Sequence, residues 1–235
     1  MQFRNNANDQ DIVTEVLRIC GTDVNSYPLA DITRRCNFAL DRFTHLALIS
    51  NGLWQFDDLN ESTLPIGTTN LFSGQYDYSF ADDVLTVEKV LIKDPNGNWS
   101  ELKPVDIDDS KSTASNIWTR ATSSGTPTVY DKFANSILLD PTPNYNSSSG
   151  LKVVFQRRYA HFSVDDDTRV PGIPLIFHYY IARYAALQWL IENSKPQKND
   201  IAAIVQNDED AIKDFFSLRG KDVRRRLVVK QESNR

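Results

Sequence analysis

The sequence predicts an α+β protein: an antiparallel helical bundle of two helix pairs, with an inserted antiparallel β domain and an extended C-terminal tail. Apolar residues recur at helical spacing near both ends of the 235-residue chain, whereas the middle alternates strand-forming runs with turn sequences. We expect residues 1–52 and 168–220 to form the two halves of the bundle. Residues 53–167 then form the β domain, and residues 221–235 form a basic tail.

The first helix is predicted from Asp9, as its N-cap, to Cys20, because the apolar residues between them share one helical face. Gly21 is expected to end it, since glycine readily adopts the left-handed conformation that follows a helix. A second helix opens near Pro28 and stops at the Asn51-Gly52 break. Its apolar stripe consists of Ile32, Cys36, Ala39, Leu40, Phe43, Leu46 and Ala47, and its charged residues, Arg34, Arg35, Asp41 and Arg42, lie mostly off that stripe.

The middle of the chain is interpreted as a meander of antiparallel strands. A run rich in β-branched residues, 84–92, is followed by the turn Asp94–Asn98 and a short return strand, which together predict a hairpin. Two further strands flank the turn at residues 134–136. A long turn is expected over residues 141–150, before a last strand that starts at Leu151. Residues 106–124 are polar and are expected to form a long loop that carries Trp118.

Two more helices are predicted after the β domain. The third begins at Pro171 and has a wide apolar stripe, which indicates a central position in the bundle. The stripe consists of Leu175, Ile176, Tyr179, Ile181, Ala182, Ala185, Leu187, Trp189 and Leu190. The fourth is capped by Asn199 or Asp200 and ends near Gly220, with one face formed by Ile201, Ile204, Val205, Ile212, Phe215 and Phe216.

Composition excludes several classes of protein. The hydrophobic fraction of 40% is typical of globular domains, and no run of residues is long and apolar enough for a membrane span. The first residues contain no apolar run, so no signal peptide is expected and the site of synthesis is predicted to be cytosolic. Cys20 and Cys36 are interpreted as small buried hydrophobes in a reducing compartment.

No motif points to catalysis, so we expect no enzyme activity, no cofactor and no metal. His45, His161 and His178 have none of the spacings of a metal site, and no glycine-rich phosphate loop or nucleophile elbow occurs. The run Asp165–Asp167 is interpreted as a solvated turn. Tyr76, Tyr78 and Phe80 alternate as base-stacking residues do, but acidic neighbours favour a role in the β-domain core or in a subunit contact.

The C-terminal segment is the most informative charged stretch. From Arg219 onward it carries a net charge of +5, whereas the whole chain carries −5, so the rest of the chain carries −10. It also contains three consecutive apolar residues, which a purely solvated tail does not need. We therefore predict a segment that docks onto an acidic neighbour by adding a strand to it. It consists of Arg224, Arg225, Arg226, Leu227, Val228 and Val229. A solubilising tail and a nucleic-acid contact are the alternatives.

Four stretches carry a resemblance to a known family: residues 34–58, 64–80, 125–145 and 170–186. Together they resemble the head-to-tail adaptor proteins of tailed bacteriophages, which form the connector ring below the portal. The resemblance extends over most of the chain and contains no catalytic signature.

The resemblance implies a structural virion protein of the neck, assembled in the host cytoplasm, with no enzyme activity. It implies a homo-oligomeric ring of about twelve copies that binds the portal protein and other tail or neck proteins. Viral DNA would pass through the ring without specific binding, and no membrane partner is expected. Two alternatives stay open: another virion protein (tail tube, terminator or capsid-associated), and a nucleic-acid-binding module that acts through the basic tail.

Overall fold

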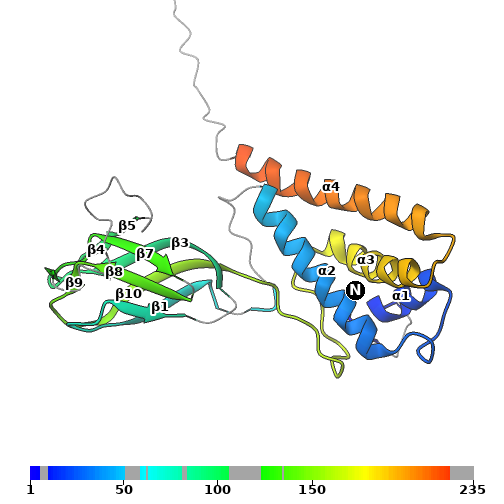
Figure 1. Ribbon diagram of the computed structural model, residues 1–235, viewed down its shortest axis with the longest axis horizontal. Coiled ribbons are helices and arrows are strands. Elements are labelled where there is room, and N and C mark those ends of the chain that lie inside the picture. Colours follow the sequence, from blue (N-terminus) through cyan, green and yellow to red (C-terminus); the bar gives the residue numbers. More distant parts are fainter. Residues whose placement is uncertain are drawn as a thin grey trace, which may run out of the picture. The chain divides into compact units, whose positions relative to one another are not determined.

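The computed structural model describes residues 1–5, 10–50, 59–61, 63–80, 84–105, 123–133 and 135–222. The chain forms two compact units. One comprises residues 1–61 and the residues from Tyr159 onward, and the other comprises residues 62–158. Helices make up the first unit and strands the second (Figure 1). The predicted α+β class is therefore confirmed.

Helix α1, Ile12–Cys20, is capped at both ends by the groups that its sequence supplies. The Asp11 carboxylate accepts a hydrogen bond of 2.7 Å from the Thr14 N–H, and Gly21 adopts a φ of 63° just beyond the last turn. The predicted stop at Gly21 is thus confirmed. The predicted N-cap at Asp9 is wrong, because Asp11 takes that role and Asp9 lies outside the described residues.

Helix α2, Leu29–Ser50, buries the whole of its predicted stripe. Arg35 departs from the prediction, since this residue is only 6% exposed although it was placed among the charged positions off the stripe. Its guanidinium lies 5.6 Å from the Tyr27 ring centroid and pairs with Glu192. A cation over an aromatic face and a carboxylate partner together offset the cost of burying this charge.

Helix α3, His178–Glu192, begins later than predicted, after a 3-10 turn, η1, at Leu175–Phe177. The prediction from Pro171 is wrong because Pro174 has an extended backbone, with ψ at 138°, and a proline disfavours helical geometry in the residue before it. Helix α4, Lys198–Asp222, begins before both predicted caps and continues two residues past Gly220.

The four helices share one core, in which α3 packs against α1, α2 and α4 (Figure 1). Phe43 of α2 lies at its centre. Its ring contacts the rings of Tyr159, Phe177, Tyr180 and Phe216, at centroid distances between 5.6 and 6.2 Å. Since Tyr180 belongs to α3 and Phe216 to α4, this cluster joins three helices through one side chain.

The β unit contains two four-stranded sheets and one two-stranded sheet. Its strands are β1 Ile66–Leu71, β2 Asp77–Ser79, β3 Val84–Lys93, β4 Trp99–Glu101, β5 Lys103–Pro104, β6 Ser124–Gly125, β7 Val129–Phe133, β8 Ser136–Asp140, β9 Thr142–Pro143 and β10 Ser147–Arg157. The strand orders are β1-β10-β3-β4 and β2-β8-β7-β5, and β6 pairs with β9. One core combines apolar residues of both large sheets, which therefore form a sandwich.

Local hairpins were predicted correctly, but the overall strand order was not. The β3–β4 hairpin pairs Lys93 with Trp99, and the Asp94 carboxylate accepts backbone hydrogen bonds within the turn. A simple meander is wrong, because β10 lies between β1 and β3 and because β5–β7 and β6–β9 are parallel. These pairings join distant parts of the chain, which local sequence patterns do not reveal.

The predicted long turn at residues 141–150 is also wrong in part. Thr142–Pro143 forms β9, and the serine-rich stretch from Ser147 already belongs to β10. Ser147 pairs with Leu71 of β1, and the register shifts between this pair and the preceding one. The partner strand thus extends β10 through residues whose own preference is for turns. The expected loop with Trp118 lies outside the described residues.

Candidate functional site

The three histidines occupy separate positions. His178 is buried. Its Nε2 donates to the carbonyl oxygen of Ile173 at 3.1 Å, and its Nδ1 lies 3.0 Å from the Met1 amino group. Burial lowers the pKa of His178 below its usual value, and the nearby ammonium group adds to this effect. His161 lies beyond the end of β10, and its Nε2 lies 2.8 Å from the Asp41 carboxylate. His45 is exposed on α2.

The acidic run Asp165–Asp167 is a hydrogen-bonded turn whose carboxylates have separate partners. Asp166 accepts a 2.7 Å bond from the Ser163 N–H and pairs with Arg169 at 3.3 Å, while Asp167 pairs with Arg4. Within the described part of the chain, no group of three histidine, cysteine or acidic side chains is arranged to hold a metal ion.

Both cysteines are free and buried in the helical unit, as the sequence predicted. Burial raises the pKa of Cys20 to about 12, and it raises the pKa of Cys36 further still. A thiol that stays protonated at neutral pH is a poor nucleophile, so their position favours packing over reactivity. As for membranes, none of the helices in the described ranges is both long enough and apolar enough to cross one.

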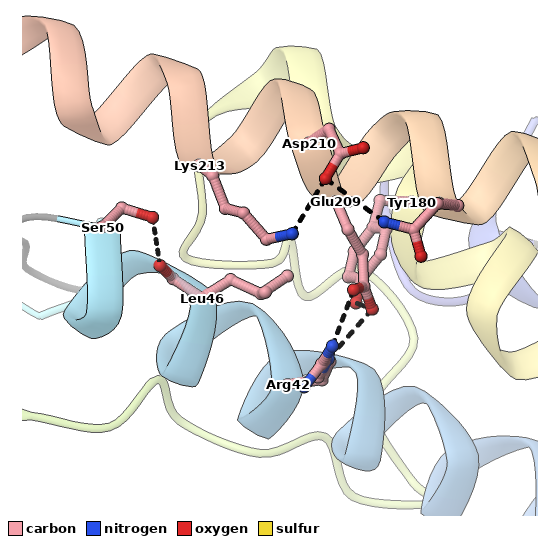
Figure 2. Close-up of polar contacts among 8 residues, drawn as sticks. Arg42, Leu46, Ser50, Tyr180, Glu209, Asp210 and Lys213 are labelled. Carbon is pink, nitrogen blue, oxygen red and sulfur yellow. Dashed lines mark hydrogen bonds and ion pairs between the residues drawn. The ribbon is translucent and has the colours of Figure 1, made fainter.

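Polar side chains connect α2, α3 and α4 on one side of the helical core (Figure 2). Arg42 donates two hydrogen bonds, of 2.9 and 2.7 Å, to the two carboxylate oxygens of Glu209. The Tyr180 hydroxyl lies 3.4 Å from the same carboxylate. Glu209 is nearly buried, with 8% of its side chain exposed, whereas Arg42 reaches the surface. This arrangement fixes α4 against α2.

The helical unit exposes large apolar side chains around η1, and we call these residues the η1 surface. Leu175 is 70% exposed, Ile176 is 69% exposed and Tyr179 is 50% exposed, although the sequence predicted all three for the buried stripe. Leu59 is also exposed, and its backbone N–H bonds the carbonyl oxygen of Gly172, three residues before η1. Neighbouring exposed side chains of this size are typical of a protein–protein contact.

The β unit has a second candidate surface, between strands β1 and β2. These strands are edges of the two large sheets. A cavity of about 360 Å³ opens between them, and its apolar lining includes Tyr78, Phe80, Leu151, Val153 and Phe155. We call this cavity the edge cleft. It offers apolar surface beside an edge of β1 that no described strand pairs with.

The aromatic prediction for β2 is confirmed in part. Tyr78 belongs to the sandwich core and Phe80 packs against it, while Tyr76 is 37% exposed. Sequence reasoning missed β1 as an element, because its residues show no alternation of apolar and polar side chains. The available signal was a run without charges, rich in threonine, between Pro65 and Gly74.

The docking residues predicted from the sequence, Arg224–Val229, lie outside the described residues. Helix α4 leads to them and ends at Asp222. Two other candidate surfaces for protein interactions lie within the described residues: the η1 surface and the edge cleft. Both are suited to binding other proteins.

A protein-family model matches most of the chain. None of the curated proteins matches the chain. The model of the SU10 adaptor protein family matches residues 8–230, which is nearly the entire sequence and includes both units. The resemblance to phage head-to-tail adaptors drawn from the sequence is confirmed by this match. The chain thus belongs to the SU10 adaptor protein family, and is a structural adaptor protein of a bacteriophage.

Proposed function

We propose that this protein is the head-to-tail adaptor of a phage virion, forming a ring below the portal that links it to the tail around the DNA channel. The family match over residues 8–230 carries this proposal. The ring would hold about twelve copies, as the resemblance to phage adaptors implies. A closed ring of identical subunits is built from heterologous contacts between neighbours. The protein would be made in the host cytoplasm and would remain in the neck of the virion.

The two units suit an adaptor because each has its own core and its own exposed apolar surface. A ring subunit must contact two neighbours as well as components above and below it. The η1 surface of the helical unit is suited to a side-to-side contact, since Leu175 and Ile176 expose most of their area. Different surfaces on the two units would allow one chain to bind a neighbour and a neck or tail protein at once.

The charge distribution favours passage of DNA without specific binding. Residues before Arg219 carry a net charge of −10, and the C-terminal segment carries +5. A negative body repels the phosphate backbone at long range, so DNA in the channel would not be retained. Strong phosphate binding along the channel would slow ejection.

The basic segment is proposed to be a docking element. Arg224, Arg225 and Arg226 would bind acidic side chains of the portal or of a neighbouring copy, and Leu227, Val228 and Val229 would add apolar contacts. Deleting residues 223–235 removes this segment and leaves all of the described structure in place. The variant should melt at the temperature of the full chain yet fail to join heads. Normal joining would contradict the docking role.

Quantitative mass spectrometry of purified virions tests the proposed function. We expect the number of copies of this chain to match that of the portal protein, at about twelve per particle. Hundreds of copies would indicate a tail-tube or capsid protein, and absence from the particle would contradict a structural role. A capsid protein quantified in the same digest serves as the internal standard.

A further inference from the structure

One edge of the β sandwich, strand β1, has backbone groups that none of the described strands uses. The carbonyl oxygen of Pro65 accepts from the Phe155 N–H, and β1 pairs antiparallel with β10. Backbone groups in an antiparallel strand alternate between the two sides. Gly67 and Thr69 therefore face β10, whereas the N–H and C=O of Thr68 point toward the open edge.

The other sheet edges carry features that hinder strand addition. Strand β4 is three residues long and includes Glu101, and β5 consists of Lys103 and Pro104. On β2, the Gln75 side chain already donates to the carbonyl oxygen of Asp77. Short length, charge and proline are common protections of an edge strand. Strand β1 is six residues long and contains no charged residue, so it is the least protected edge among the described strands.

The edge cleft lies directly beside this open edge. Gly67, Thr68 and Thr69 of β1 form one wall, and Tyr78, Ser79 and Phe80 form the opposite wall. Ile137, Leu151, Val153 and Phe155 complete the lining. A strand added to β1 would place every second side chain over this apolar lining. The combination of an open edge and an apolar cleft matches the requirements of β-strand addition.

We propose that strand β1 and the edge cleft accept residues Arg224–Val229 from a second copy of this chain. The segment would pair with β1 through its backbone. Leu227 and Val229, which share one face of an extended strand, would enter the cleft. The inference rests on the proposed function, in which this segment docks, and it assigns the surface that receives the segment.

Three properties of the chain favour this occupant. Val229 is the seventh residue after Asp222, and at full extension these seven residues reach about 24 Å, so the segment can extend from the end of α4 onto a copy that adjoins this one. Val228 and Val229 are β-branched and follow Leu227, as suits an added strand. The segment is basic, whereas the rest of the chain carries a net charge of −10. Electrostatic attraction between the segment of one copy and the remainder of another therefore favours a second copy as the partner.

Cross-linking between two full-length variants tests the inference. One variant carries Thr68→Cys and the other carries Val228→Cys with a size tag, so that only a contact between copies gives the mixed product. A short bismaleimide is added to the mixture, and Cys20 and Cys36 stay unreactive because they are buried. The matched control replaces Thr68→Cys by Ser100→Cys on β4, the opposite edge of the same sheet, about 14 Å away.

We expect the mixed product to form at least about tenfold faster with Thr68→Cys than with Ser100→Cys. A free peptide of residues 221–235 should suppress it. The same peptide with Leu227→Asp and Val229→Asp should compete at least about tenfold more weakly, since two apolar side chains no longer enter the cleft. Peptide competition does not depend on the folding of any protein variant.

Three results would overturn the inference. The first is an equal rate of cross-linking at both edges, and the second is no effect of the peptide. The third is cross-linking that occurs only in a further variant with Thr68→Cys and Val228→Cys in the same chain. The last result would show that the segment binds its own chain. These outcomes are separate from the proposed function, because the copy number in virions does not depend on which surface receives the segment. Virion copies equal to those of the portal together with no mixed product would reject the inference alone.

Discussion

Arg42 of α2 and Glu209 of α4 form a bidentate ion pair in which the carboxylate is nearly buried and the guanidinium reaches the surface (Figure 2). Glu209→Ala would leave Arg42 without its carboxylate partner and would remove the acceptor of the Tyr180 hydroxyl. We expect the free energy of unfolding to fall by about 1–3 kcal/mol. Urea unfolding of the single and double variants of Arg42 and Glu209 should give a coupling energy of about 1 kcal/mol.

The adjacent Lys213–Asp210 pair is a matched control, because it lies on the same helix but its carboxylate is 58% exposed, whereas that of Glu209 is nearly buried (Figure 2). Lys213→Ala should change the free energy of unfolding by no more than about 0.5 kcal/mol, since surface ion pairs contribute little. If the loss at Glu209 were as small as the loss at Lys213, the buried pair would not fix α4 against α2.

Phe43 should be among the most sensitive positions of the helical unit, because its ring contacts four other aromatic rings. Phe43→Ala would open a cavity at the junction of three helices and lower the free energy of unfolding by about 3–5 kcal/mol. Phe38, which is 54% exposed on the same helix, provides the control. Phe38→Ala should change stability by at most about 0.5 kcal/mol, as measured by urea unfolding.

His178 should make the stability of the helical unit depend on pH. Burial lowers its pKa in the folded state, so the unfolded chain binds a proton more readily than the folded chain. Its contribution is complete above its ordinary pKa of about 6.5 and is lost as the pH falls through the lower folded value. Thermal melts between pH 7.5 and pH 5 should show this loss, and His178→Gln should reduce it.

His45 is the control for this measurement, since it is exposed on α2. His45→Gln should change the thermal midpoint at pH 7.5 by no more than a few degrees, because it removes no buried contact. A parallel decline with pH in the wild type and in His178→Gln would show that other groups cause the acid sensitivity.

Leu175 and Ile176 should matter for assembly and not for folding, because both expose most of their area at the η1 surface. Replacing both by aspartate would keep the thermal midpoint of the isolated protein within a few degrees. Ring formation in the virion neck should be lost, since charges at the core of a contact are strongly unfavourable. Particles that carry the doubly substituted protein at normal copy number would contradict this role.

Helical elements could be predicted from the sequence because their signals are local. Ile32 through Ala47 repeat at helical spacing and are buried as expected, and Gly21 ends α1 as its conformational freedom predicts. The errors arose where contacts between residues distant in the sequence determine the structure. Arg35 is buried because its guanidinium lies over the Tyr27 ring and pairs with Glu192. The first residues of the predicted α3 stripe lie outside the helix because Pro174 delays its start.

The β unit and its surface were harder to predict for the same reason. Strand β1 is defined by its pairing with β10, more than seventy residues later, and its own residues carry no periodic pattern. The edge cleft exists only because two sheets present their edges on the same side of the sandwich. Family membership, in contrast, was recognisable from stretches that resemble phage adaptors, such as residues 34–58 and 170–186, and the family match confirms it.

Cryo-electron microscopy of the virion neck is the most direct test of the adaptor role. We expect a ring directly below the portal, into whose subunits both the four-helix unit and the β sandwich of this chain can be fitted as separate bodies. Their cores should be recognisable, with the aromatic cluster around Phe43 in one and the sandwich of β1 and β2 in the other. A portal that contacts a different protein, with this chain in the capsid, in the tail tube or absent, would contradict it.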